Sequence, residues 1–166
     1  MSFGGQWAVM GGQWSTHAEQ SAAARRLLAQ LLGYKPVVEH DARGVPFLPA
    51  HPEVHISLSH CRTAVAVAIS KDGPVGIDIE CRRSINDDLV RRVCTGNEIA
   101  CIDCSDDRTM SFLQLWTRKE AVLKCRGTGI KGFESMVHAL EERVSVCDLP
   151  SSLPDTVVAL AYVTAG

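Results

Sequence analysis

The sequence lacks a long hydrophobic run, and no apolar stretch approaches the roughly 20 residues that a membrane-spanning helix requires. A cationic start followed by an apolar core, the pattern of a secretory signal peptide, is also missing. Neither charge sign dominates, because 17 Lys and Arg stand against 19 Asp and Glu. We therefore expect a cytoplasmic protein that spans no membrane and binds no nucleic acid, and that holds any anionic ligand with a few local cations.

The sequence also lacks the even cysteine set of a disulfide framework. Its seven cysteines are an odd number, and only Cys101 and Cys104 form a C-x-x-C pair. We expect reduced thiols, while a module stabilised by a metal on the cysteines stays open as an alternative. The length of 166 residues and the 46% hydrophobic content fit one domain over residues 1–166 with its own core.

The first predicted helix covers residues 17–32. Thr16 and Glu19 have the spacing of a capping box, and strong helix formers follow until Gly33 offers a stop. Residues 34–52 carry four prolines among turn residues, which predicts an irregular connection that has room for one short strand.

Three strands are predicted next, at residues 54–59, 64–70 and 75–80, with turn residues between them. We expect them to form an antiparallel meander, in which the first and third strands run the same way. His60 and Glu80 would then lie at the same end of the sheet.

The second half of the sequence predicts helices followed by strands. The further signals, in chain order, are a helix at 85–94, a capping box of Thr95 with Glu98, a long helix from about 107 to 126 that ends at Gly127 and Gly129, and two strands at 144–149 and 156–165. This order predicts an α+β fold in which an antiparallel sheet packs against a long helix.

Two carboxylates stand out on the third predicted strand. Asp78 and Glu80 share one face, roughly 7 Å apart along the chain. Like charges at this distance cost free energy unless water or a cation screens them. A divalent metal ion is one solution, and a solvated strand face is the other.

The long predicted helix carries charge beside a tryptophan. Trp116, Glu120 and Lys124 recur every fourth residue and so share one face, with Lys119 beside them. Glu120 followed by Lys124 is also the favourable order of a common surface ion pair. The tryptophan points instead to the core boundary, where charges need partners. Together with the two strand carboxylates, Glu120 would offer Mg²⁺ hard oxygen ligands, and the lysines would hold a phosphate group.

These stretches resemble the 4′-phosphopantetheinyl transferases of the larger, surfactin-synthetase-activating type. VGIDIE at residues 75–80 matches the family strand V-G-[IV]-D-[IV]-E, and WTRKEAVLK at residues 116–124 matches its helix [FW]-[ST]-x-K-E-[AS]-x-x-K. The segments SLSHC, CTGNEIACI and GTGI resemble three further family segments, so the likeness covers roughly residues 15–135. It implies a two-lobed pseudodimer with a short N-terminal lobe, 1–70, and a metal-binding lobe, 71–166.

The resemblance also implies an activity. Such an enzyme transfers the 4′-phosphopantetheine arm of coenzyme A to a serine of an apo acyl or peptidyl carrier protein, uses Mg²⁺ and releases adenosine 3′,5′-bisphosphate. The carrier would belong to fatty acid or secondary metabolite biosynthesis, and the expected docking cations are Arg82, Arg83, Arg91 and Arg92. A non-catalytic family remnant that binds coenzyme A or a carrier protein is the alternative.

Site residues follow from the matched positions. The implied metal ligands are Asp78, Glu80 and Glu120; the implied coenzyme A contacts are Arg25, Arg43, Ser59, His60, Lys119 and Lys124; and the implied catalytic residues are Glu120, Glu98 and Lys124. Arg26 is an alternative to Arg25.

Two roles stay open in this assignment. Glu98 is explained equally well as half of a capping box, and either it or Glu120 is the base; a metal-bound carboxylate is a poor base, which favours Glu98. The family commonly has a lysine where Val45 stands here, and Arg43 is the candidate to replace it.

Overall fold

The computed structural model describes residues 3–128, 133–141 and 144–163. Its elements in chain order are β1 (Gln6–Gly11), α1 (His17–Leu32), β2 (Glu39–His40), β3 (Pro46–Phe47), β4 (His55–His60), β5 (Ala64–Ser70), β6 (Val75–Cys81), α2 (Asp87–Val93), α3 (Gly96–Asp103), α4 (Arg108–Arg126), α5 (Phe133–Val137), the 3₁₀ turn η1 (Ala139–Glu141), β7 (Ser145–Asp148) and β8 (Thr156–Tyr162). The fold is mixed α+β with antiparallel sheets, as the sequence predicts.

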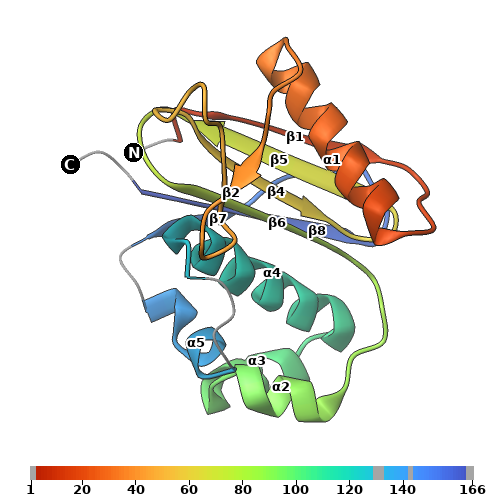
Figure 1. Ribbon diagram of the computed structural model, residues 1–166. Coiled ribbons are helices and arrows are strands. Elements are labelled where there is room, and N and C mark those ends of the chain that lie inside the picture. The colour runs from red at the N-terminus through yellow and green to blue at the C-terminus, as the bar shows by residue number, and fades with distance from the viewer. Residues whose placement is uncertain (1–2, 129–132, 142–143, 164–166) are drawn as a thin grey trace.

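The described strands form two sheets. One has the order β1-β5-β4-β3-β2 and the other β6-β8-β7, and the pairings of these described strands are all antiparallel. Apolar side chains such as Ala66, Ile77 and Leu160 pack between the sheets. Helix α1 packs on β4 and β5 from one side, and α4 packs on β6 and β8 from the opposite side (Figure 1). The molecule therefore consists of four layers, with a helix on each outer face.

The predicted meander is wrong in its third strand. Strands β4 and β5 pair as expected, but β6 pairs with β8. The hydroxyls of Ser57 and Ser59 on β4 accept hydrogen bonds from backbone N–H groups of β6, at 3.0 and 3.3 Å. Both contacts advance in the same direction, so β4 and β6 run parallel. The expectation that His60 and Glu80 lie at one end is therefore confirmed, although side chains rather than a backbone ladder join the strands.

The helices begin and end at the predicted signals. Thr16 caps α1 through a complete capping box, and Gly33 ends it in the left-handed conformation. Asp107 caps α4, and Gly127, with φ 63°, ends it. Gly129, the other predicted stop, lies outside the described residues. Local signals therefore account for both outer helices.

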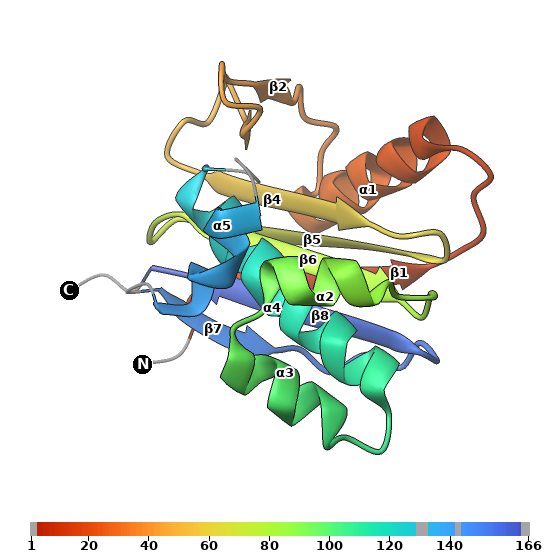
Figure 2. The same cartoon turned by 90° about the horizontal axis from the view of Figure 1, so that it is seen from below.

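Several elements were not predicted. Strand β1 pairs along β5 at the edge of the larger sheet, and the irregular connection contains the short strands β2 and β3. Helix α5 and the turn η1 lie beside α2 and α4, and Figure 2 shows α2, α3 and α5 gathered on the outer side of α4. These elements extend the layers without changing the fold class.

Two expectations from composition concern membranes and thiols. Among the described residues, no helix has the length and apolar character needed to cross a membrane. All seven cysteines are free thiols, as an odd number without a disulfide framework predicts.

Strand β6 approaches α4 most closely at Gly76. A Cβ at this position would lie 2.0 Å from the carbonyl oxygen of Ala121 and 2.4 Å from the backbone nitrogen of Cys125. Backbone atoms cannot yield at such distances, so only glycine permits this contact. Because Asp78 follows two residues later on the same strand face, the close approach holds it opposite the charged face of α4.

Candidate functional site

The two acidic segments converge on one cleft between β4, β6 and α4. Its volume is about 260 Å³, and the residues that line it are Leu58, Ser59, His60, Asp78, Ile79, Glu80, Trp116, Glu120 and Lys124. The charged face of α4 and the carboxylates of β6 therefore meet, as the family resemblance implies, although 42 residues separate Asp78 from Glu120.

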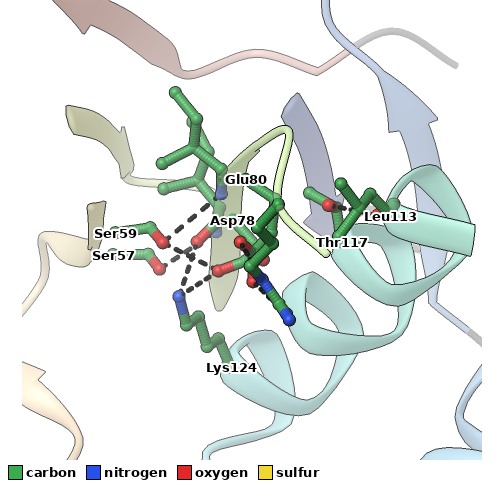
Figure 3. Close-up of polar contacts among 10 residues, drawn as sticks. Ser57, Ser59, Asp78, Glu80, Leu113, Thr117 and Lys124 are labelled. Carbon is green, nitrogen blue, oxygen red and sulfur yellow. Dashed lines mark hydrogen bonds and ion pairs between the residues drawn. The ribbon is translucent and has the colours of Figure 1, made fainter. Parts of the chain in front are cut away.

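Asp78 is the most buried of the cleft carboxylates, with 5% of its surface exposed. Its Oδ1 accepts a hydrogen bond from the Ser59 hydroxyl at 2.7 Å and one from Lys124 Nζ at 2.6 Å (Figure 3). Lys124 also donates to the carbonyl oxygen of Ile77 at 3.3 Å. A buried carboxylate requires such partners, and here they come from two different elements, β4 and α4. Together they fix its orientation in the cleft.

Glu80 and Glu120 lie in the same cleft, and their negative charges are less well compensated by neighbouring groups than the charge of Asp78. Burial raises the pKa of Glu80, against which Arg83 acts from 3.3 Å. Burial, and then the Asp78 carboxylate, raise the pKa of Glu120 to about 7, with Lys124 opposing the shift. The cleft thus concentrates negative charge that an added cation would stabilise.

The three cleft carboxylates are the kind of ligand that a hard divalent cation prefers, but in this structure they are too far apart to hold one together. Three carboxylates are the donors that Mg²⁺ prefers, and their mutual repulsion shows in the raised pKa of Glu120. Within the described part of the chain, however, no three His, Cys, Asp or Glu side chains stand close enough to hold a metal ion. Lys124 instead occupies the Oδ1 atom of Asp78. The ligand set of Asp78, Glu80 and Glu120 therefore stays a prediction.

A second, cationic pocket of about 300 Å³ adjoins the cleft and shares Leu58, His60 and Lys124 with it. The lining residues that can carry positive charge are His17, Arg25, His40, Arg43, His60 and Lys124, and no carboxylate among the described residues lines this pocket. Such a lining suits an anionic ligand. Arg25 lines the pocket and Arg26 does not, which favours Arg25 of the two alternatives.

The position of the family's missing lysine also lies in this cationic pocket. Val45 is part of the lining, as is Arg43, the candidate replacement. Arg43 is held by Asp41, which accepts hydrogen bonds from its guanidinium at 2.9 and 3.0 Å. The arginine is therefore near the expected place, but its charge is partly compensated.

Lys119 and Glu98 lie away from the cleft. Lys119 has no exposed surface and donates to two backbone carbonyls, at 2.8 and 3.3 Å, and to Glu98 at 2.7 Å. Glu98 also accepts from the backbone N–H of Thr95 in a complete capping box. Adjacent helix residues point about 100° apart, so Lys119 faces α2 and α3 while Glu120 faces β6. The structure does not bring this pair to the other candidates.

Sequence reasoning missed two histidines of the cationic pocket. His17, the first residue of α1, makes an edge-to-face ring contact with His60 at 4.6 Å between centroids, and His40 lies on β2. A signal was present, because His17, Ser21 and Arg25 recur at helical spacing and line the pocket from one face of α1.

The four candidate docking arginines all have contacts within the protein. The contacts are Arg82 with Asp107 and Asp155, Arg83 with Glu80, Arg91 with Asp88, and Arg92 over the Phe133 ring. All four are exposed, so a negatively charged partner can still reach them.

Comparison with known proteins identifies the family. A family model described as ACPS, 4′-phosphopantetheinyl transferase superfamily, matches residues 74–156, which is half of the chain and contains both motifs. The chain belongs to the 4′-phosphopantetheinyl transferase superfamily. This confirms the resemblance seen in the motifs and places the protein in a family of transferases.

Curated relatives of this superfamily agree. The 4′-phosphopantetheinyl transferase AcpT of Salmonella typhimurium is 30% identical over 128 residues, which cover 75% of this chain and 67% of AcpT. A 4′-phosphopantetheinyl transferase of Bacillus subtilis is 32% identical over 89 residues, covering 52% of this chain and 39% of that protein. The Sfp transferase of Bacillus subtilis is 30% identical over 115 residues, covering 66% of this chain and 50% of Sfp. The chain thus spans half or less of these two Bacillus relatives, and similarity to Sfp supports the surfactin-synthetase-activating type.

Proposed function

We propose that this protein transfers the 4′-phosphopantetheine arm of coenzyme A to a serine hydroxyl of an apo acyl or peptidyl carrier protein and releases adenosine 3′,5′-bisphosphate. The observation that carries this proposal is the meeting of Asp78, Glu120 and Lys124 in one cleft that opens onto a cationic pocket. Family membership and the similarity to relatives named 4′-phosphopantetheinyl transferase support the same reaction.

Coenzyme A would use both spaces. Its phosphorylated nucleotide suits the cationic pocket, where Arg25 and Arg43 offer positive charge. Burial lowers the pKa of His60, so this residue offers a hydrogen-bond donor rather than a charge. Lys124 lies where the pocket joins the cleft, which suits a contact with the pyrophosphate. Ser59 already directs its hydroxyl to Asp78, so its part in the proposal is to orient that carboxylate.

Mg²⁺, when bound, would neutralise charge on the pyrophosphate oxygens. We assign its binding to Asp78, Glu80 and Glu120, because these carboxylates line the cleft. Lys124 would leave Asp78 and offset the charge that develops on the leaving group. Most of the rate enhancement would then come from positioning and charge compensation.

The proton of the attacking serine needs an acceptor in the cleft. Of the two carboxylates considered, only Glu120 lines it, whereas Glu98 is engaged by Lys119 and its own helix N-terminus. Cation binding would lower the basicity of Glu120, but the acceptor must lie within reach of the serine hydroxyl, and Glu98 does not line the cleft. The proposal therefore assigns this role to Glu120 rather than Glu98.

We also propose that residues 1–70 and 71–166 form the two lobes of a shortened pseudodimer. The five-stranded sheet with α1 is built from the first range, and the three-stranded sheet with α4 from the second. The free thiols agree with a reducing compartment such as the cytoplasm.

A carrier mass assay tests the transfer directly. Purified protein is incubated with coenzyme A, Mg²⁺ and a panel of apo carrier proteins from fatty acid, polyketide and peptide pathways, and each carrier is weighed by mass spectrometry. We expect a mass gain of one phosphopantetheine on at least one carrier, and no gain with EDTA. If the protein binds coenzyme A and modifies no carrier, the non-catalytic remnant is correct instead.

The proposed docking surface for the carrier protein is tested by measuring how fast the carrier associates with variants of this surface. Arg91 is exposed and forms an ion pair with exposed Asp88. Charge reversal at Arg91 is expected to slow association rather than lower maximal turnover. An unchanged dependence of rate on carrier concentration would remove this arginine from the docking surface.

A further inference from the structure

Two cysteines 20 residues apart in sequence meet beside the cleft. Ser57 and Ser59 on β4 accept hydrogen bonds from Ile77 and Ile79 on β6. The same register, continued by two residues on each strand, places Cys61 opposite Cys81. Burial, and then the neighbouring Cys81 thiol, raise the pKa of Cys61. Cys61 directly follows His60 at the end of β4, and Cys81 directly follows Glu80 as the last residue of β6. The thiol pair therefore lies at the ends of the two strands that carry the candidate site, and neither thiol has a part in the proposed transfer.

The backbone on both sides of this pair is held by hydrogen bonds. The N–H of Cys61 donates to the carbonyl oxygen of Ala64 at 2.8 Å in the tight turn between β4 and β5. Cys81 lies opposite Thr156 in the β6–β8 ladder, and the next N–H, of Arg82, donates to Asp155 at 2.8 Å. Because neither segment is free to move far, the meeting of the two thiols is a property of the fold.

A small reagent can reach the pair. Both side chains are only half-buried, and Cys81 lines an open pocket together with Arg62, Arg82 and Asp155. Arg82 is paired with Asp107 and Asp155, so the positive charge that favours an anionic reagent there comes from Arg62.

A metal site is a poor explanation for the pair. Over the described ranges, no third His, Cys, Asp or Glu joins the two thiols to make a set that could hold a metal ion. Structural zinc uses four protein ligands, so two thiols alone do not suffice.

We propose that Cys61 and Cys81 form a reversible disulfide by exchange with a low-molecular-weight anionic disulfide, such as glutathione disulfide. One cysteine thiolate attacks the small disulfide, forms a mixed disulfide and releases one small thiol. The second cysteine attacks the protein sulfur of that intermediate, closes the Cys61–Cys81 bond and releases the second small thiol. Two protein thiols are thereby oxidised, and the small disulfide is reduced to two thiols that keep the two protons.

Disulfide formation would disturb the site next to it. An S–S bond is about 2.05 Å long, shorter than the contact distance of two free thiols, so the two sulfur atoms must approach each other. Because the backbone on both sides is held, the bond would strain the ends of β4 and β6. These ends carry His60 and Glu80, which line the cleft. We expect transfer to fall about tenfold on oxidation and to recover on reduction, since small displacements of positioning groups cost this much or more. This consequence rests on the proposed function, whereas the disulfide itself does not.

Peptide mapping tests the disulfide independently of activity. The folded protein is treated with glutathione disulfide, remaining thiols are alkylated, and a tryptic digest is analysed by mass spectrometry. Trypsin yields residues 44–62, with Cys61 as the single cysteine, and residues 72–82, with Cys81 as the single cysteine. We expect these two peptides joined and separable by dithiothreitol. Recovery of both as alkylated or singly glutathionylated peptides would overturn the proposal.

Matched variants identify the pair and its effect. Replacing the exposed pair, Cys101→Ser with Cys104→Ser, should leave the cross-link unchanged, whereas Cys61→Ser should abolish it. Cys61→Ser with Cys81→Ser should keep basal transfer and lose the response to oxidant. A cross-link that forms without changing transfer would overturn the regulatory consequence. If no carrier is modified by any form of the protein, the proposed function fails while the cross-link result stands.

Discussion

Helices α1 and α4 cover the two sheets from opposite sides, yet they treat charge differently. The buried positions of α1 are all apolar, namely Ala23, Ala24, Leu27 and Leu28, and its arginines are exposed. Helix α4 buries Thr117 and Lys119 completely and keeps Glu120 and Lys124 half-buried. Each buried polar group of α4 has partners, such as the carbonyl oxygen of Leu113 for Thr117 (Figure 3). Burying charge costs free energy, so its concentration on one helix indicates where the chemistry lies.

The largest effect is expected for Glu120→Gln. This change keeps the shape of the side chain but removes a cleft carboxylate that we assign to the cation and to the serine proton. Transfer at saturating Mg²⁺ should fall by about 10²–10⁴, the range typical of a lost acid–base group. Carrier mass spectrometry measures the rate, and circular dichroism checks the fold. Near-normal transfer would show that Glu120 takes no part in the reaction, and it would contradict the view that the buried charge of α4 marks the reactive site.

Substitutions of the two lysines of α4 should have different effects, one mainly on stability and the other mainly on transfer. Lys119→Met leaves Glu98 and two backbone carbonyls without their partner, so the free energy of unfolding should fall by about 3 kcal/mol. Lys124→Met should instead reduce transfer and coenzyme A affinity, with a smaller loss of stability, because Asp78 keeps Ser59. Urea denaturation and transfer kinetics on both variants measure the difference. Equal effects of the two changes on transfer would contradict it.

Gly76→Ala tests the close approach of β6 to α4. The added methyl group meets backbone atoms, so stability should fall by about 1–3 kcal/mol or more through overpacking. Gly96→Ala is the matched control, because nothing lies within 4 Å of a Cβ at that position. Thermal denaturation compares them, and equal melting temperatures would show that the strand can move away from the helix.

The buried charge of α4 should also appear in the pH dependence of metal-free protein. Because the pKa of Glu120 rises from 4.5 to about 7 on folding, its protonation favours the folded state at low pH. That contribution is complete below about pH 4.5 and is lost as the pH rises through 7. Glu120→Gln should therefore gain stability over wild type between pH 5 and pH 8, by about 2 kcal/mol. A difference that is constant with pH would contradict the raised pKa.

The smallest predicted effect concerns α1. Arg25→Gln should raise the KM for coenzyme A about tenfold, the cost of one charge-assisted hydrogen bond, with little change in kcat. Arg26→Gln, one residue further along, should change neither, since Arg26 does not line the cationic pocket. Steady-state kinetics with varied coenzyme A decide between them, and the reverse result would assign the contact to Arg26.

The parts of the fold that local signals determine were predictable from sequence. Capping residues such as Thr16 and Thr95 and the helix-ending Gly127 gave the helix ends. The partner of β6 was not predictable, because β8 lies far along the chain and nothing local distinguishes it from β5. Strand β1 was missed because its pairing with β5 depends on a distant segment and its own residues are only half-buried.

The site shows the same division. The spacing of Trp116, Glu120 and Lys124 on one helix face predicted which α4 side chains line the cleft. The burial of Lys119 was not predictable, because it depends on how α2 and α3 pack against the next face of the same helix. The ligand and the reaction were inferred from the resemblance to a family, because the spacing of residues along a helix or strand does not identify either.

Binding of Mn²⁺, a spectroscopic substitute for Mg²⁺, tests the central claim most directly. Electron paramagnetic resonance counts bound Mn²⁺ in the presence of coenzyme A for wild type, Asp78→Asn, Glu120→Gln and Glu98→Gln. We expect one ion in wild type and Glu98→Gln, and strongly weakened binding in the other two, because carboxylates from β6 and α4 share the cation. Binding as tight as wild type in both Asp78→Asn and Glu120→Gln would contradict a common site.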